Sequence, residues 1–148
     1  MGVRYRIAAR GNGESAARSV IEAGAHEFVI DEPKDRHGTD QGPSPLEYLM
    51  GAFAGCTNVI SSRIAEEMGV IWKNGSIDVE AELDGDVLQG RDVPVAFPKL
   101  TIQVHVRSDA SPEQVEQLKQ ELAKRCPVSV LFRQAGTEVI ENWTVEPI

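Results

Sequence analysis

One run of residues limits the possible folds of this 148-residue chain more than any other part of it. Residues 42–69, GPSPLEYLMGAFAGCTNVISSRIAEEMG, predict a single long helix. Ser44 can cap the helix, Pro45 suits its first position and Glu47 completes a capping box. Gly69 is expected to end it. The middle of the run, LMGAFAGCTNVI, is apolar on nearly every side, so other elements must cover the helix all round.

Small side chains in this helix indicate what its cover could be. Gly51, Ala52, Ala54 and Gly55 allow a second backbone to approach closely. A partner helix is the natural cover, and it can come from a second copy of the chain.

The residues before the long helix are rich in strand formers and alternate in polarity. They predict a meander of three strands, at 3–10, 16–23 and 26–32. The pair Asn12-Gly13 is predicted as the first hairpin turn, and Gly24 marks the second. A polar loop rich in glycine and proline, 33–43, then leads into the helix.

The residues after the long helix predict a second set of strands and helices. Two alternating segments, 76–84 and 99–108, indicate a half-exposed antiparallel pair. A capping box that begins at Ser111 starts a second helix, which runs to Arg125. A third, short helix begins at Cys126-Pro127, and 137–147 is a closing strand. The predicted fold class is therefore α+β.

Length and composition predict one soluble domain, residues 1–148. The net charge of −8 argues against a nucleic-acid partner and against docking on an anionic membrane. No run reaches the roughly 18 apolar residues of a membrane span, and MGVRYRIAAR lacks the apolar core of a signal peptide. We therefore expect a cytoplasmic location, where cysteines are more often redox-active or reduced than locked in a structural disulfide.

The two cysteines are the main candidates for chemistry. Cys56 lies in the middle of the long helix, where it could simply be a core residue. Cys126 begins the third helix and follows Lys124 and Arg125. The positive end of a helix dipole and two cations predict a lowered pKa for its thiol. Cys56 and Cys126 are therefore either two packing residues or a redox pair.

Other kinds of site have little support in the sequence. The three histidines, His26, His37 and His105, have no metal-ligand spacing with each other or with the cysteines, so no metal site is expected. The chain also lacks the glycine-rich motifs of nucleotide sites and the GxSxG motif of many hydrolases. No cofactor is expected.

A thiol peroxidase requires few groups. One thiolate attacks the peroxide and becomes a sulfenic acid, and a second thiol condenses with it to a disulfide. An arginine can keep the first thiol ionised, and Arg10 and Arg18 from the predicted N-terminal strands are both candidates. Leu49, Phe53 and Ile60 around Cys56 would suit an organic hydroperoxide over hydrogen peroxide, or they are simply core residues.

The run DEPKDRHGTDQGPSPLEYLMGAFAGCTNV, together with the later RCPVSVLF, resembles the OsmC/Ohr family of osmotically inducible and organic hydroperoxide resistance proteins. The resemblance implies an OsmC-like α+β fold in an intertwined homodimer, with antiparallel sheets wrapped around long central helices. It implies that Cys56 is the peroxidatic cysteine and Cys126 the resolving cysteine, at a site near the dimer interface. The implied reductant is a dithiol, which is a lipoylated protein in the hydroperoxide-resistance branch.

This chain departs from the best-known branches at one position. Their motif has a glutamate ten residues before the cysteine, where this chain has Leu46 and places Glu47 one residue later. Glu47 is nine residues before Cys56, or about 180° around the helix. Glu47 is therefore either a site residue or only a helix cap, and the GPSPLE run resembles a less characterised OsmC-like branch.

The expected function is a peroxiredoxin-type thiol peroxidase that acts in oxidative-stress defence. Its expected substrates are organic hydroperoxides, with hydrogen peroxide as a further candidate. The alternative is a non-catalytic OsmC-like protein that binds a small apolar ligand.

Overall fold

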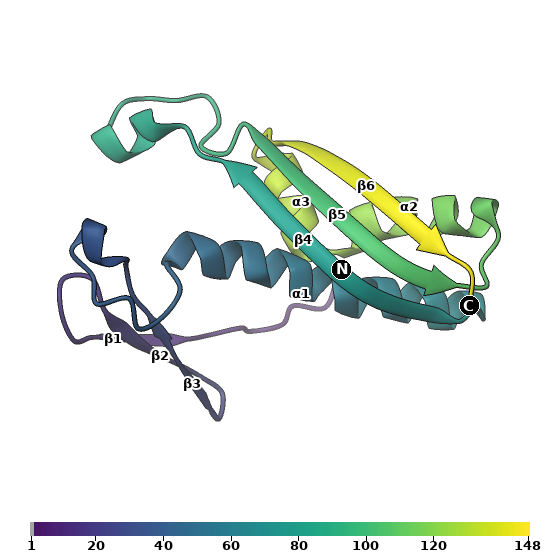
Figure 1. Cartoon of the computed structure of the whole chain (residues 1–148), viewed down its shortest axis with the longest axis horizontal. Helices are drawn as coiled ribbons and strands as arrows, with labels where there is room; N and C mark the ends of the chain where they lie inside the picture. The colour runs from purple at the N-terminus through teal and green to yellow at the C-terminus, as the bar shows by residue number, and fades with distance from the viewer. Residues whose placement is uncertain (1) are drawn as a thin grey trace. The chain divides into compact units, whose positions relative to one another are not determined.

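The computed structural model describes residues 2–148 (Figure 1). These residues form two compact units, of which the second comprises Met50–Ile148. The first unit contains one three-stranded antiparallel sheet in the order β1-β2-β3. Its strands are β1 (Arg10–Gly13), β2 (Ser19–Ala23) and β3 (His26–Ile30).

The start of the first sheet differs from the prediction. Pairing begins only at Arg10, and Asn12 lies within β1 opposite Val20, so the hairpin turn predicted at Asn12-Gly13 is wrong. The turn instead uses Ser15, whose hydroxyl accepts hydrogen bonds from the backbone N–H groups of the residues two and three positions later, at 3.2 and 2.9 Å. A serine side chain that binds its own backbone in this way forms a turn without help from glycine.

The other two predicted strands are confirmed, with shorter bounds than the sequence pattern indicated. The turn between them has Gly24 at a φ of 60°, a left-handed conformation that glycine adopts without strain. The sequence therefore located this turn correctly.

One buried carboxylate organises the loop that follows β3. Asp31 is fully buried, and its oxygens accept hydrogen bonds from the Thr39 hydroxyl and from the backbone N–H groups of Glu32, Thr39 and Gln41. A one-turn helix, η1 (Lys34–Arg36), lies inside this loop. The hydrogen bond from the Thr39 hydroxyl is the main cause that lowers the pKa of Asp31 to about 2, against the effect of burial.

The long predicted helix is confirmed as α1 (Pro45–Met68), which has 24 residues. The Ser44 hydroxyl accepts a hydrogen bond from the backbone N–H of Glu47 and donates one to its carboxylate. Gly69 ends the helix at a φ of 69°.

The second unit is built on a three-stranded sheet in the order β4-β5-β6. The strands are β4 (Trp72–Glu82), β5 (Lys99–Ser108) and β6 (Glu138–Glu146). The antiparallel pair that the sequence predicted is confirmed as β4 and β5, whereas β6 pairs with β5 in parallel. Two helices lie between β5 and β6 in the chain, which is the usual form of connection between parallel strands.

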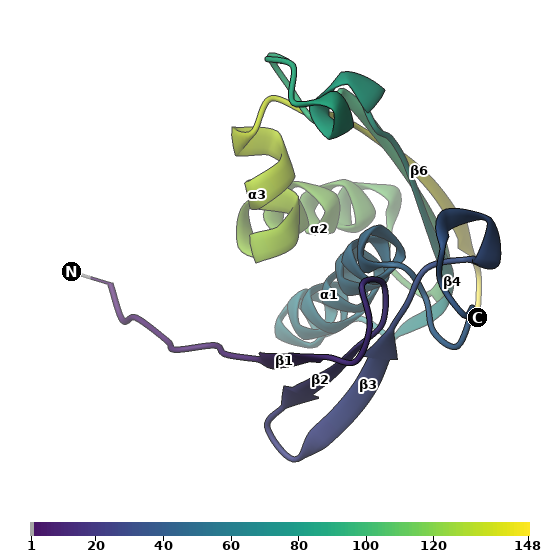
Figure 2. The ribbon, with the colours of Figure 1, turned by 90° about the vertical axis from the view of Figure 1, so that its left-hand side faces the viewer.

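Helices cover one face of this second sheet. Figure 2 shows that α2 (Pro112–Arg125), α3 (Pro127–Gln134) and the part of α1 from Met50 onward lie on that face. The capping box predicted at the start of α2 is confirmed between Ser111 and Gln114. Every second residue of β5 points into the core and is buried: Leu100, Ile102, Val104, Val106 and Ser108.

The apolar surface of α1 is only partly covered. Within the second unit its buried residues follow one stripe: Phe53, Thr57, Ser61, Ile64 and Ala65. Val59 is 47% exposed, and a Cβ added at Gly51 or Gly55 would meet nothing within 4 Å. Among the helices formed by residues 2–148, none combines the length and the apolarity that a bilayer crossing requires.

Candidate thiol site

The two cysteines meet in the second unit, although they are 70 positions apart in the chain. Their sulfur atoms are 3.0 Å apart, with the Cys126 thiol donating a hydrogen bond to the Cys56 sulfur. Both are free thiols. Cys126 is fully buried, whereas Cys56 is partly exposed. The pair therefore has one accessible sulfur and one sulfur that solvent does not reach.

Local sequence explains why Cys126 lies at this point. Cys126 ends α2 and also begins α3, with an extended backbone at φ −82° and ψ 110°. Pro127 causes this break because proline disfavours helical backbone at the residue before it and lacks the N–H that would continue α2. Proline suits the first position of α3 for the same reasons.

The surroundings of the thiols are apolar. Cys126 belongs to a buried cluster with four residues from α1 and α2: Ile64, Ala65, Leu118 and Leu122. Cys56, Ile60 and Val128 pack against this cluster. One turn before Cys56, Phe53 packs on Phe132 of α3 with ring centroids 5.7 Å apart. Of the apolar neighbours predicted from the sequence, Phe53 is thus buried in the core and Ile60 packs against it.

Burial decides the protonation of Cys126. Desolvation, followed by the hydrogen bond to Cys56, raises the pKa of its thiol to about 11. The backbone N–H groups of Ser129 and Val128 act in the opposite direction, although neither forms a capping hydrogen bond with the sulfur. The sequence-based prediction of a lowered pKa for Cys126 is therefore wrong.

The cation next to Cys126 is engaged elsewhere. The Arg125 guanidinium donates two hydrogen bonds to the Glu67 carboxylate near the end of α1, at 2.6 and 2.7 Å. These hydrogen bonds lower the pKa of Glu67 and raise the pKa of Arg125. A paired cation contributes little to the ionisation of a neighbouring thiol. This ion pair has no signal in the sequence, because the two residues are 58 positions apart.

The other predicted site residues belong to the first unit. Arg10 is exposed on β1, and the Arg18 guanidinium forms an ion pair with Glu14 at 2.7 Å. Glu47 has the helix-capping contacts with Ser44 described above. The roles of Arg10, Arg18 and Glu47 at the thiols stay predictions.

Two further hollows of the second unit lie apart from the thiols. One, of about 450 Å³, is lined largely by apolar residues, including Val115, Trp143 and Pro147, with Lys119 and Glu146 among its polar groups. The other, of about 470 Å³, lies over polar residues of β4 and β5. Within residues 2–148, no three metal-binding side chains come together.

Comparison with known proteins supports the resemblance seen in the sequence. A family model described as OsmC-like protein matches residues 38–142. An OsmC-like protein from Mycoplasma pneumoniae superposes with a TM-score of 0.75 at 18% identity, covering 99% of each chain. No similar sequence is found among curated proteins.

Two structures of organic hydroperoxide resistance proteins are also similar. The protein from Elizabethkingia anophelis has a TM-score of 0.64 at 21% identity and covers 100% of both chains. OhrB of Bacillus subtilis has a TM-score of 0.62 at 19% identity, covering 95% of this chain and 98% of that one. At these identities, the structural similarity establishes the fold.

Proposed function

This chain belongs to the OsmC-like protein family, and we propose that it is a thiol peroxidase that reduces organic hydroperoxides. The observation that carries the proposal is the contact between the Cys56 and Cys126 sulfur atoms at 3.0 Å in an apolar cluster. Similar structures include proteins named for organic hydroperoxide resistance. Hydrogen peroxide is a further candidate substrate.

The reaction begins at Cys56, because its sulfur is the more accessible of the two. The Cys56 thiolate attacks the hydroperoxide, so that an S–O bond forms as the O–O bond breaks. The alkoxide that leaves takes up a proton and departs as an alcohol. Cys56 is then a sulfenic acid.

Cys126 completes the oxidation. The raised pKa keeps its thiol protonated until it attacks the Cys56 sulfur. An S–S bond forms, the S–O bond breaks, and the departing hydroxide takes the Cys126 proton and leaves as water. A dithiol reductant, such as a lipoylated protein, then supplies two electrons and two protons to restore both thiols.

Three further residues have proposed roles. Arg10 or Arg18 holds Cys56 ionised, and Glu47 orients that arginine or serves only as the helix cap. Because the family match, residues 38–142, extends across both units, both are assigned to one OsmC-like domain. The protein would act in the cytoplasm in defence against oxidative stress.

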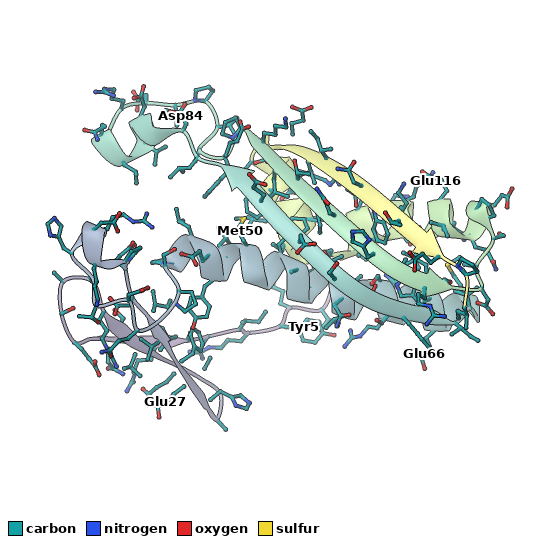
Figure 3. All side chains as sticks on the ribbon, viewed as in Figure 1. Tyr5, Glu27, Met50, Glu66, Asp84 and Glu116 are labelled. Carbon is teal, nitrogen blue, oxygen red and sulfur yellow. The ribbon has the colours of Figure 1, made fainter. Side chains whose placement is uncertain are left out.

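An intertwined homodimer is part of the proposal. The segment before β1 alternates apolar and basic residues like a strand but pairs with no strand within residues 2–148. Val3, Tyr5 and Ile7 are 78%, 85% and 94% exposed, and Figure 3 shows Tyr5 on this segment. A second copy that covers these side chains and the open face of α1 would bury apolar surface.

The test is consumption of cumene hydroperoxide with dihydrolipoamide as the reductant. Cys56→Ser should lose nearly all turnover, whereas Cys126→Ser should complete a single turnover and then accumulate sulfinic acid at Cys56. Ser76→Ala, an exposed change on β4, serves as the control. Activity that persists in Cys56→Ser would refute the mechanism.

A second candidate function is binding of a small apolar ligand without catalysis. The hollow lined by Val115, Trp143 and Pro147 favours it, because apolar walls with a few polar groups are typical of ligand sites. Fatty-acid titration monitored by tryptophan fluorescence, with Val115→Trp as the blocking variant, tests this function. A peroxidase with no saturable ligand binding would exclude it.

A further inference from the structure

We propose that the ion pair between Arg125 and Glu67 positions Cys126 for its attack on the Cys56 sulfenic acid. Both charged residues are positioning residues, since they act through Cys126 and do not touch the reacting atoms. The inference rests on the proposed thiol chemistry and adds a determinant of the disulfide step.

The ion pair connects the two backbone segments that carry the cysteines. Arg125 is the last residue of α2 and is bonded directly to Cys126. Glu67 is on α1, eleven residues after Cys56, which is roughly 16 Å along the helix axis and on nearly the same face. The end of α2 therefore contacts α1 at two separate points. One is the contact between the Cys126 and Cys56 sulfur atoms, and the other is the bidentate ion pair between Arg125 and Glu67. Glu66, the neighbour of Glu67, is labelled on α1 in Figure 3.

Two parallel hydrogen bonds restrain Arg125 more than a single contact would. The Nη1 and Nη2 atoms of Arg125 lie 2.6 and 2.7 Å from the two carboxylate oxygens of Glu67. A bidentate pair of this kind fixes orientation as well as distance. Neighbouring charges reinforce it, because Arg63 favours the ionised form of Glu67 and Glu121 favours the ionised form of Arg125.

Cys126 needs such a restraint because it lies where the helical backbone is interrupted. Its N–H donates to the Leu122 carbonyl at 2.9 Å, and its carbonyl accepts from the Val130 N–H at 3.0 Å. Its own backbone between these bonds is extended, so no continuous helix links α2 to α3 at this residue. The Arg125–Glu67 pair holds the α2 side of this break against α1.

The position of Cys126 decides between two fates of the sulfenic acid. Disulfide formation requires the sulfur atoms to close from 3.0 Å to about 2.05 Å. In the competing reaction the sulfenic acid sulfur attacks a second hydroperoxide, so that a second S–O bond forms as the O–O bond breaks, leaving a sulfinic acid and a second alcohol. A displacement of about 1 Å can slow a reaction about 100-fold. A loosened Cys126 therefore favours the sulfinic product.

The experiment compares four variants of the full chain. Arg125→Met keeps the aliphatic stem but removes both hydrogen bonds, and Glu67→Gln removes the negative charge. Arg125→Lys is the conservative variant, which keeps the charge but not the fork. Lys124→Met is the matched control, because Lys124 is 74% exposed and lies 4.0 Å from Glu121 in an ordinary surface pair.

Stopped-flow mixing with cumene hydroperoxide separates the two steps, and mass spectrometry counts disulfide and sulfinic acid. Arg125→Met and Glu67→Gln should form sulfenic acid at the wild-type rate but form the disulfide about 2- to 5-fold more slowly, because the two side chains of the pair are 36% and 58% exposed. Their sulfinic fraction should rise with peroxide concentration, with Arg125→Lys intermediate and Lys124→Met like the wild type. A wild-type disulfide rate in folded Arg125→Met and Glu67→Gln would overturn the proposal, as would an equal slowing in Lys124→Met.

A second oxidant separates this inference from the peroxidase proposal. Diamide takes two electrons and two protons from a thiol pair and leaves a disulfide, without any peroxide. If the wild type fails with hydroperoxides, the peroxidase proposal fails, and slower diamide oxidation in Arg125→Met than in Lys124→Met still supports the positioning role. Equal diamide rates in these variants would refute that role. Urea unfolding of each variant confirms that the comparison uses folded protein.

Discussion

Two buried ionisable groups organise the two units of this protein in opposite ways. Asp31 in the first unit is fully buried and has a pKa of about 2, so it keeps its charge. Cys126 in the second unit is equally buried and has a pKa raised to about 11, so it keeps its proton. Burial alone therefore does not determine the charge of a group.

The difference lies in the neighbours. Asp31 receives hydrogen bonds from one hydroxyl and three backbone N–H groups, which replace the water that it loses. Cys126 is surrounded mainly by hydrocarbon, and its thiol donates a hydrogen bond to another thiol. In the first unit, hydrogen-bond donors stabilise the charged carboxylate of Asp31. In the second unit, apolar side chains pack around the neutral thiol of Cys126.

The largest effect is expected from the packing around Cys126. Leu118→Ala removes a side chain with 0% exposure from that cluster, so the free energy of unfolding should fall by about 2–5 kcal/mol. Urea unfolding measures this loss. Leu88→Ala is the control because Leu88 is 72% exposed. Equal losses at both positions would contradict the assignment of the core.

The loop around Asp31 should be nearly as sensitive to added volume. A Cβ at Gly38 would lie 1.7 Å from the backbone oxygen of Glu32, so Gly38→Ala must displace the loop. We expect a loss of about 1–3 kcal/mol in urea unfolding. Gly13→Ala is the matched control, because a Cβ at Gly13 meets nothing within 4 Å. A neutral Gly38→Ala would show that the loop is not fixed as described.

Removing the charge of Asp31 should give an intermediate effect. Asp31→Asn replaces one carboxylate oxygen, which accepts hydrogen bonds, by an NH2 group, which donates them, next to four donors. We therefore expect the Tm at pH 7 to fall by roughly 5 °C. Because the folded pKa of about 2 is below the ordinary 3.8, the wild-type contribution is present above pH 3.8 and is lost as the pH falls through 2. The variant should lack this acid-dependent loss, whereas the exposed Asp40→Asn should keep it. An unchanged acid profile in Asp31→Asn would refute the role of the carboxylate.

The smallest effect is expected at alkaline pH. The folded pKa of Cys126, about 11, is above the ordinary 9.0, so its contribution is present below pH 9 and is lost toward pH 11. In the reduced protein this amounts to about 1 kcal/mol at pH 10 relative to pH 8. Cys126→Val should remove this part of the decline in urea unfolding. A decline identical to that of the wild type would place its origin in another group.

Local sequence predicted the elements better than their partners. The caps at Ser44 and Ser111 located both long helices, because a cap depends only on residues a few positions apart. The parallel pairing of β6 with β5 had no local signal, because an alternating pattern does not name the neighbouring strand. The turn predicted at Asn12-Gly13 was wrong because the Ser15 hydroxyl stabilises a turn two residues later.

In the candidate site, too, local features were predicted from the sequence and tertiary contacts were not. Pro127 predicted a helix start at Cys126, but the contact of Cys126 with Cys56 came from the family resemblance and not from spacing. The pKa of Cys126 was predicted in the wrong direction because the tertiary fold buries the thiol and turns Arg125 toward Glu67. The position of a charged residue in the sequence does not show which partner it contacts in the folded protein.

The separation of the two cysteines in the chain has a consequence for the unfolded protein. The segment between Cys56 and Cys126 contains β4, β5 and α2, and oxidation would close it into a covalent ring. A ring of this size removes unfolded-chain entropy worth about 4 kcal/mol. Each oxidation would thus tighten the constraint on more than half of the second unit, and each reduction would release it. Resistance to unfolding would then depend on the fraction of molecules in which the two thiols are oxidised.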